Sequence, residues 1–193
     1  MTEQELIDGL NNQNKNAIQY LVNEYQKKVI KTAYYFVANM EDAEDLSQEI
    51  FLDIINSINS FKRSSSLSTW IYRITVNKSL NMVKRHQRHG LMIRLESLLW
   101  RSSSPGSGQE PEPSAAANDF EQQEKQRLLH AAIGRLPENQ RIAFVLSKFD
   151  DQSYKQIAEI MKIGLPAVES LIHRAKLNLQ KLLIHHFSEY QKT

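Results

Sequence analysis

Apolar side chains recur every three or four residues along most of this chain, and no segment alternates apolar and polar residues with period two. The first spacing places an apolar stripe along a helix, whereas a half-buried strand needs the second. The pattern therefore predicts an all-α fold whose stripes pack into hydrophobic cores. The first series comprises Ile18, Leu21, Val22, Tyr25, Val29, Ala33, Phe36, Val37 and Met40. The second comprises Ala43, Leu46, Ile50, Ile54 and Ile58.

The apolar spacing stops between Ser102 and Asp119, where Ser, Gly, Pro and Glu predominate. Such a composition buries too little apolar surface to order the backbone. We therefore expect two small helical domains joined by a flexible linker. The expected boundaries are 1–95 for the first domain, 96–119 for the linker, 120–187 for the second domain and 188–193 for a tail.

Composition narrows the possible functions. The 193 residues include no cysteine, which excludes disulfides, thiolate zinc sites and a cysteine nucleophile. The histidines lack the spacing of a helix-borne zinc site, and no glycine-rich phosphate loop occurs. We expect no cofactor, no metal and no enzymatic activity. The polar N-terminus does not resemble a signal peptide, and no apolar run approaches the roughly 20 residues of a membrane span, so we expect a cytoplasmic protein without membrane insertion.

A third predicted helix begins after a Ser-rich loop, with Ser68 or Thr69 as its cap, and runs to about His89. No carboxylate occurs from Ile54 to Leu95, although the net charge of the chain is only +2. Cations and amides along such a helix can bind phosphates and base edges, and nearby rings can stack on an unpaired base. Alternatively, Trp70 is a core residue and the cations only favour the helix C-terminus. The candidate DNA-binding residues are Trp70, Arg73, Asn77, Lys78, Asn81, Lys84, Arg85 and Arg88.

The second predicted helix carries the opposite charge. Its face opposite the isoleucines contains Asp42, Asp45, Glu49 and Asp53, with Gln48 beside them. Like charges at this spacing repel each other, and no lysine or arginine occurs in this helix. The row of carboxylates therefore either faces water or binds a basic partner.

The C-terminal block predicts a helix-turn-helix. Pro137 can start a helix that buries Ile142, Val145, Leu146 and Phe149. Ser153 and Gln156 form a capping box for the next helix. This helix and the one after it form the predicted pair. The spacing of Ala158, Val168 and Leu171 is typical of two helices that cross at a sharp corner, and Pro166 suits the first turn of the second helix. The candidate DNA-binding residues on the outer face are Lys155, Ala167, Ser170, His173, Arg174 and Lys176.

Four motifs in this order resemble the extracytoplasmic-function (group IV) sigma factors of the bacterial sigma-70 family. They are EDAEDLSQEIFLDI, TWIYRITVNKSLN with Phe61 ahead of it, LPENQRIAFVL, and SYKQIAEIM followed by AVESLIHRAK. The resemblance covers nearly the whole chain apart from the linker and the ends. It implies a sigma region 2 helical bundle followed by a sigma region 4 helix-turn-helix domain.

The resemblance also implies a function: a subunit that directs core RNA polymerase to promoters and melts them. The polymerase would be bound through its beta-prime clamp helices and its beta subunit, and the candidate contacts are Asp42, Asp45, Gln48 and Glu49. The third helix would open the minus-ten element and hold a flipped base near Asn77. The resemblance assigns the same role to four residues of the preceding loop and its start: Phe61, Lys62, Arg63 and Ser64. The helix-turn-helix would bind the minus-thirty-five element, and an anti-sigma factor is an expected partner.

Three positions depart from the family pattern. Glu169 and Leu171 stand where relatives often carry Lys or Arg, and Lys162 stands where they often carry Gly. These differences affect the expected base preference and not the expected fold. The alternative function is a self-sufficient helix-turn-helix transcriptional regulator that binds a symmetric operator without polymerase. A helical adaptor that binds only protein is disfavoured by the long stretch without carboxylates.

Overall fold

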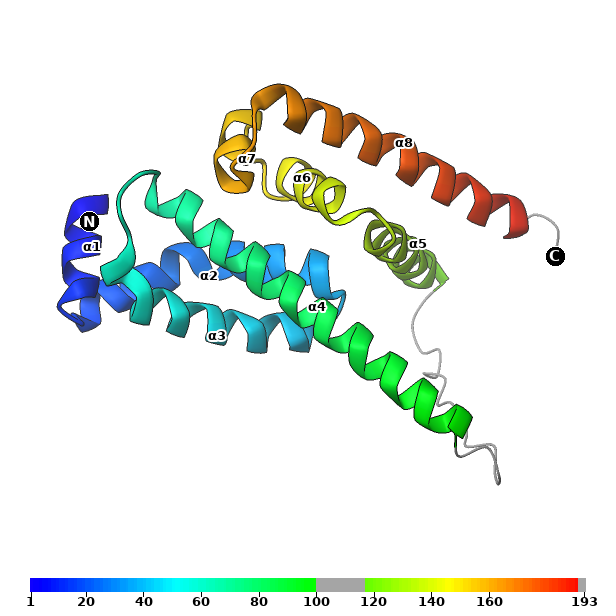
Figure 1. Ribbon diagram of the computed structural model, residues 1–193, viewed down its shortest axis with the longest axis horizontal. Coiled ribbons are helices and arrows are strands. Elements are labelled where there is room, and N and C mark those ends of the chain that lie inside the picture. Colours follow the sequence, from blue (N-terminus) through cyan, green and yellow to red (C-terminus); the bar gives the residue numbers. More distant parts are fainter. Residues whose placement is uncertain (100–116, 191–193) are drawn as a thin grey trace.

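The computed structural model describes the backbone of residues 1–99 and 117–190 and the side chains of residues 1–89 and 124–184 (Figure 1). Every regular element within these ranges is helical, so the predicted all-α fold is confirmed. The helices are α1 (Glu3–Asn11), α2 (Lys15–Val37), α3 (Met40–Ser57), the short η1 (Ile58–Ser60), α4 (Leu67–Leu99), α5 (Ala117–Gly134), α6 (Glu138–Lys148), α7 (Tyr154–Met161) and α8 (Leu165–Tyr190). The expected linker, 96–119, lies mostly outside the described residues.

Helices α1 to α4 form an N-terminal unit around one core. Figure 1 shows α2, α3 and α4 running side by side, with α1 across one end. Leu21, Ile50 and Ile54 are fully buried in this core, as the helical spacing predicted. Met40 was expected to end the first long helix, but it starts α3. Ala38 adopts a left-handed conformation that ends α2, and the Asn39 side chain then caps α3 by accepting a hydrogen bond from the Asp42 amide.

Helix α1 was not predicted, although the sequence contains its signals. Thr2 and Glu5 form a capping box, and Leu6, Ile7 and Leu10 form a short buried stripe. Gly9 lets this helix approach α2 closely, because a Cβ atom at Gly9 would lie 2.6 Å from the Cβ of Ala17. The helix therefore closes the end of the N-terminal core.

The two ends of α4 differ from the prediction. The Ser66 hydroxyl accepts a hydrogen bond of 3.1 Å from the Thr69 amide, so Ser66 is the capping residue. Ser68 and Thr69 lie inside the helix, and their prediction as caps was wrong. The helix continues to Leu99, beyond the expected end near His89.

Helices α5 to α8 form a C-terminal unit, and the predicted helix-turn-helix is α7 and α8. The Ser153 and Gln156 capping box is present at the start of α7, and Pro166 lies in the first turn of α8. Lys162, not Gly164, adopts the left-handed conformation in the turn, with φ 55°. Pro137 precedes α6 as its N-cap instead of starting it, because its extended backbone is not helical.

The two units pack against each other. Phe36 of α2 and Tyr72, Val76 and Leu80 of α4 are buried in the same hydrophobic cluster as the residues of α5 to α8. Phe149, which was expected inside the C-terminal core, is only partly buried and stacks on Tyr35 of α2. Figure 1 shows α6 and α7 facing the N-terminal unit and α8 on the far side.

Candidate polymerase-binding and nucleic-acid-binding surfaces

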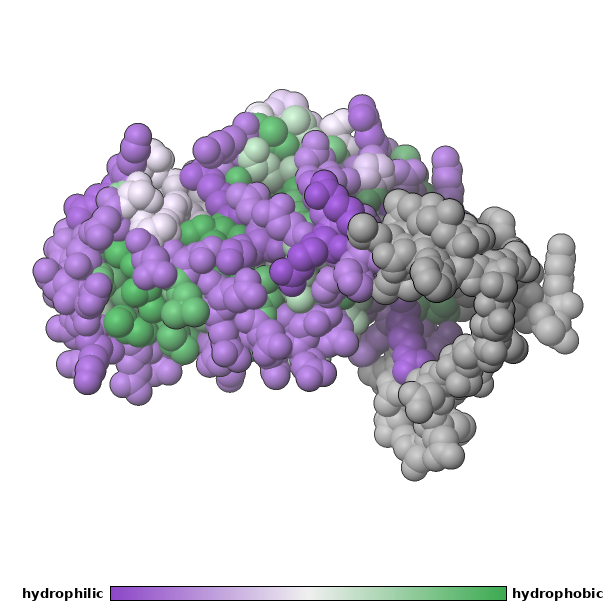
Figure 2. Space-filling view, turned by 60° about the horizontal axis from the view of Figure 1, so that its bottom comes forward, coloured by the Kyte–Doolittle hydropathy of each residue, from purple (hydrophilic) through white to green (hydrophobic). Residues whose placement is uncertain are grey.

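The acidic face of α3 is open to solvent. Asp45, Gln48 and Glu49 are exposed, and Asp42 is half-buried beside the helix N-terminus. Leu52 continues the same face one turn further and is 60% exposed, the largest fraction among the large apolar side chains of the described residues. Figure 2 looks onto one side of the molecule and shows a hydrophobic patch toward the N-terminal end, surrounded by hydrophilic side chains. A contiguous apolar patch bordered by polar side chains is typical of a protein-binding surface.

Lys78 of α4 balances part of this charge. Its ammonium group lies 2.9 Å from Asp53 and 3.4 Å from Glu49. The hydrogen bond to Asp53, with the further contact to Glu49, raises the pKa of Lys78. Helix α3 itself contains no lysine or arginine, so the cation that pairs with its carboxylates comes from the neighbouring helix. Lys78 therefore faces α3 and not the side of α4 that carries Arg73 and Lys84.

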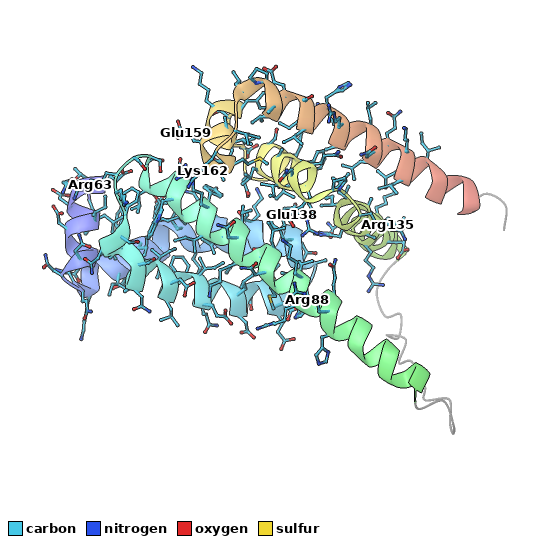
Figure 3. The ribbon with its side chains drawn as sticks, in the orientation of Figure 1. Arg63, Arg88, Arg135, Glu138, Glu159 and Lys162 are labelled. Atoms are coloured by element: carbon cyan, nitrogen blue, oxygen red, sulfur yellow. The ribbon has the colours of Figure 1, made fainter. Side chains whose placement is uncertain are left out.

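The predicted basic stripe of α4 faces the C-terminal unit along part of its length. Arg73 donates hydrogen bonds to the backbone carbonyls of Glu159, at 2.5 Å, and Ile160, at 3.3 Å. Lys84 forms an ion pair of 2.8 Å with Glu138 at the start of α6. Figure 3 shows Glu138, Glu159 and Lys162 on the side of the C-terminal unit that faces α4.

The side chains of the remaining stripe residues are exposed to solvent. Asn77 is exposed and lines a hollow of about 340 Å³ between α4 and the C-terminal unit. Asn81, Arg85 and Arg88 are exposed further along the helix. The structure thus places the residues of one predicted stripe in two environments, one against protein and one open to solvent.

The loop before α4 is held by α1. Arg63 has a left-handed backbone, and its guanidinium group lies 2.7 Å from the Gln4 side chain and 3.4 Å from Asp8. Lys62 and Ser64 are exposed. The rings of Phe61 and Trp70 are half-buried against the N-terminal core, with centroids 5.3 Å apart. The contact of Arg63 with α1 was not predicted, because no helix was expected at residues 3–11.

The side chains on the outer face of the helix-turn-helix are exposed to solvent, as the sequence predicted. Val168 is fully buried, and Leu171 packs against the C-terminal core, as its spacing predicted. Glu169 is also exposed, on the same helix as most of the candidate DNA-binding residues. All the candidate DNA-binding residues of this face are exposed: Lys155, Ala167, Ser170, His173, Arg174 and Lys176.

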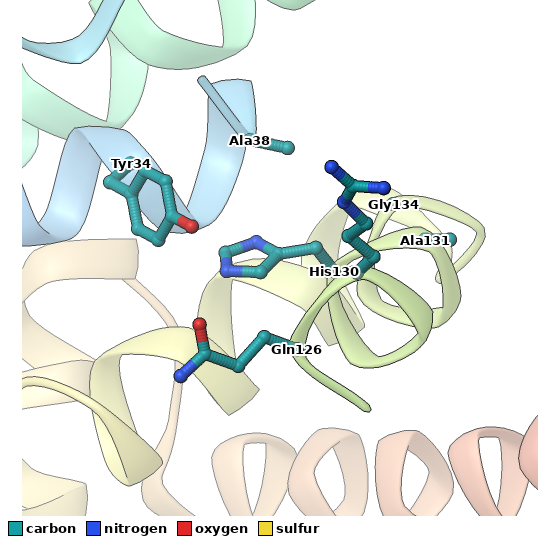
Figure 4. A pocket seen from close by; sticks show the side chains of 7 residues that line it. Tyr34, Ala38, Gln126, His130, Ala131 and Gly134 are labelled. Carbon is teal, nitrogen blue, oxygen red and sulfur yellow. The ribbon is translucent and has the colours of Figure 1, made fainter. Parts of the chain in front are cut away.

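An aromatic cluster joins the two units. Tyr35 of α2 stacks on Phe149 with centroids 3.6 Å apart and on His130 of α5 at 5.2 Å. Burial lowers the pKa of His130, whose Nδ1 atom has no hydrogen-bond partner. Figure 4 shows His130 pointing from α5 toward Tyr34, beside a hollow of about 520 Å³ that also borders Gln126.

A partly buried carboxyl lies next to this cluster. The Oδ2 atom of Asp150 is 2.8 Å from the hydroxyl of Thr32 on α2, and burial raises the pKa of Asp150 to about 6. No local sequence pattern indicates this contact, because Thr32 and Asp150 are 118 residues apart and meet only when the units pack together.

Among the described side chains, no group of three or more His, Asp or Glu residues is arranged to hold a metal ion. None of the helices, over the same residues, combines the length and apolar character needed to cross a bilayer.

Two family models match this chain. Sigma-70 region 2 matches residues 21–89, and Sigma-70 region 4 matches residues 126–179. Among curated relatives, the ECF RNA polymerase sigma-E factor of Escherichia coli K12 is 30% identical over 176 residues, which cover 91% of each chain. The sigma-H factor of Pseudomonas aeruginosa is 29% identical and covers 94% of this chain and 93% of its own. The ECF sigma factor SigE of Mycolicibacterium smegmatis is 33% identical over 88% of this chain, which spans 62% of that relative's length.

Solved structures share the fold. CnrH, solved in complex with the cytosolic domain of CnrY, superposes with a TM-score of 0.68 at 20% identity and covers 95% of this chain and 97% of its own. The sigma factor RpoE of Bartonella quintana, solved with the anti-sigma factor NepR, has a TM-score of 0.56 at 21% identity and covers 86% of this chain and 95% of its own.

Proposed function

This chain belongs to the extracytoplasmic-function sigma factors of bacterial RNA polymerase, and from that premise we propose that it directs core polymerase to specific promoters and helps to melt them. The observation that best supports this function is the separation of two surfaces within one chain. An acidic face with an exposed leucine lies on α3, and an exposed helix-turn-helix face lies on α8. A sigma factor needs both surfaces, because it must bind a large enzyme and a DNA duplex at the same time.

The polymerase contact in this proposal is the outer face of α3. Asp42, Asp45, Gln48 and Glu49 supply hydrogen-bond acceptors for a basic partner surface, and Leu52 adds apolar area at its edge. The clamp helices of the beta-prime subunit are the proposed partner. The contact with the beta subunit is proposed from family membership alone.

The minus-ten contact in this proposal uses α4 and the loop before it. Asn77 and Asn81 can bond to base edges, while Arg85 and Arg88 can neutralise phosphates. Phe61 and Trp70 lie at the start of this surface, where a ring can stack on an unpaired base. Capture of a flipped base costs a few kcal/mol of unstacking, which these contacts offset.

The minus-thirty-five contact uses the start of α8. Ser170 and Arg174 lie one turn apart on its exposed side and point the same way as Ala167. Lys155, His173 and Lys176 flank them and suit phosphate contacts. Glu169 can accept a hydrogen bond from a cytosine amino group, which favours a cytosine in the recognised sequence.

The other elements of the proposal follow from this role. The chain acts in the cytoplasm, where RNA polymerase is, and it has no catalytic activity of its own. An anti-sigma factor is a proposed partner, because RpoE, a sigma factor of the same fold, was solved with one. The alternative of a self-sufficient regulator is not favoured, because the curated relatives are RNA polymerase sigma factors.

Transcription in vitro tests the proposal. The full chain is added to core polymerase that lacks its own sigma factor, on a library of genomic promoter fragments. We expect transcripts that begin at a common sequence pattern, and Asp45→Lys should abolish them by reversing charge at the polymerase contact. Glu24→Lys makes the same charge change on α2 and should leave transcription intact. Failure of the wild-type chain to bind the core enzyme would refute the proposed function.

A further inference from the structure

We propose that the hollow between α4 and the start of α6 binds a free tetrahedral oxyanion, hydrogenphosphate, through Arg141, Lys84 and the first amides of α6. Such a ligand site goes beyond the proposed function and is independent of it. Three features meet at this place. They are a buried guanidinium group without an acceptor, a helix N-terminus without a side-chain cap, and a hollow of suitable size that both border.

Arg141 of α6 is a buried cation that lacks an acceptor. The residue is 6% exposed, and its Nε atom has no hydrogen-bond partner within the described part of the chain. The ring of Phe36 lies against its guanidinium group, with 5.1 Å between Cζ and the ring centroid. A ring covers only the face of a guanidinium group, whereas the N–H donors lie in its plane and still need acceptors. A buried donor without an acceptor costs free energy, so this group favours an incoming acceptor.

The charge around Arg141 is only partly balanced. Burial lowers the pKa of Arg141 and the charge of Glu138 raises it, but a guanidinium group stays protonated in either case. Among the described side chains, Glu138 forms its ion pair with Lys84, at 2.8 Å, instead of with Arg141. Two cations therefore share one carboxylate, and the hollow beside them has a net positive charge.

The start of α6 adds donors to the same place. The N-cap of the helix is Pro137, which has no side-chain acceptor, and the Arg141 amide donates the first intrahelical hydrogen bond to the Pro137 carbonyl at 3.0 Å. The amides of residues 138–140 precede this bond, at the end of the helix that carries about half a positive charge. Arg141 lies one turn further, and helical side chains lean toward the N-terminus. The guanidinium group and the free amides therefore serve the same ligand position.

The hollow has the size and lining of a small-anion site. Its volume is about 170 Å³, roughly that of five or six liquid waters. Lys84 and Gln87 line it from α4, and Glu138 and Arg141 line it from α6, with Glu138 on the side that faces α4 (Figure 3). A tetrahedral oxyanion with a few waters fits this space, whereas a nucleotide brings a base and a sugar that it does not accommodate. The ligand is therefore a free anion and not a phosphate of the DNA backbone.

Glu138 determines which oxyanion fits. An ionised carboxylate offers only acceptors, so it repels an oxyanion that has no proton to donate. Hydrogenphosphate carries one O–H group and can donate it to Glu138, while its other oxygens accept from Arg141 and Lys84. Sulfate has the same shape and charge but no O–H group. We therefore expect phosphate to bind at least about 10-fold more tightly than sulfate, because sulfate leaves the carboxylate without a donor.

NMR of the isotope-labelled full chain observes the site directly, because each arginine Nε–H group gives its own cross-peak. Sodium phosphate is titrated above neutral pH at constant ionic strength, with sodium sulfate and sodium chloride in parallel. We expect phosphate to shift the Arg141 peak and to slow its exchange with water, sulfate to act at least about 10-fold more weakly, and chloride to have no effect. The peak is assigned by its loss in Arg141→Lys. A peak that ignores phosphate, or that responds equally to all three salts, overturns the proposal.

Surface variants separate ligand binding from misfolding. Lys84→Gln removes the second cation and should weaken phosphate binding about 5- to 10-fold, whereas Lys28→Gln, in the ion pair of 2.6 Å with Glu24, should leave it unchanged. Glu138→Gln supplies an amide donor and should reduce the preference for phosphate over sulfate to within about 3-fold. Glu24→Gln should keep the wild-type preference. An unchanged preference in Glu138→Gln, or an equal loss of affinity in the two lysine variants, overturns the proposed site.

A competing oligonucleotide distinguishes the two possible sources of a phosphate group. A single-stranded oligonucleotide of mixed sequence, added to the chain saturated with phosphate, should leave the Arg141 peak in place. Displacement of phosphate together with a new shift of this peak would assign the site to a nucleic-acid backbone and would overturn the free anion. Binding to core polymerase tests the proposed function separately, and its failure leaves the phosphate result unchanged.

Discussion

The turn of the helix-turn-helix contains a lysine in a conformation that suits glycine. Lys162 ends α7 with φ 55° and ψ 45°, where the Cβ atom of an L-residue costs about 1 to 2 kcal/mol. Glycine avoids this cost but loses more backbone entropy on folding, about 0.5 to 1 kcal/mol. Lys162→Gly should therefore stabilise the C-terminal unit by roughly 0.5 to 1 kcal/mol. The amide of residue 162 keeps its hydrogen bonds to the carbonyls of Ala158 and Glu159.

Urea denaturation measures this effect as a shift of the midpoint at constant slope. The matched control is Lys162→Ala, which removes the same exposed side chain and keeps the Cβ atom. Only the glycine variant should gain stability, and amide exchange should slow within α7 and the first turns of α8. Equal stability of the two variants would show that the left-handed residue carries no strain, and the reasoning would be refuted.

Three further substitutions test other elements. Gly9→Ala should destabilise the N-terminal unit by about 1 to 3 kcal/mol in thermal unfolding, because its Cβ would overlap Ala17, and an unchanged midpoint would contradict that close approach. Asn77→Ala should leave polymerase binding intact and reduce open-complex formation measured with permanganate, and normal melting would remove Asn77 from base capture. Arg174→Ala should weaken minus-thirty-five binding by about 1 to 3 kcal/mol if it contacts a base, or reduce the salt slope by about 1 if it contacts phosphate. An unchanged affinity and salt slope would place Arg174 outside the interface.

Local sequence signals predicted the helices better than their ends. The buried stripe of α3 and the capping box of α7 follow from spacing and side-chain chemistry, and the structure confirms both. The start of α4 was misplaced because several serines and a threonine compete as caps, and the choice of Ser66 depends on where the helix packs. Helix α1 was missed because its stripe is short and its stability comes largely from contact with α2.

Contacts between distant segments could not be predicted in the same way. The balance of the acidic face by Lys78 and the meeting of Thr32 with Asp150 both depend on how helices pack, which no local pattern encodes. The exposed face of α8 was predictable, because a helix that buries Val168 must turn Ser170 and Arg174 outward. The sequence therefore predicts which side chains lie on the surface of a helix. Which of them contact another helix depends on tertiary packing.

Apolar and charged contacts contribute unequally to the packing of the two units. The Lys84 and Glu138 side chains are 49% and 46% exposed, so their ion pair contributes only about 0 to 1 kcal/mol. The buried rings and aliphatic side chains beside the stripe each contribute more, about 1.5 to 3 kcal/mol when fully removed from water. Apolar area thus sets how tightly the units hold together, while charge selects the face of α4 that is covered. Because the ion pair adds little, the buried apolar contacts and not the Lys84–Glu138 pair hold the two units together.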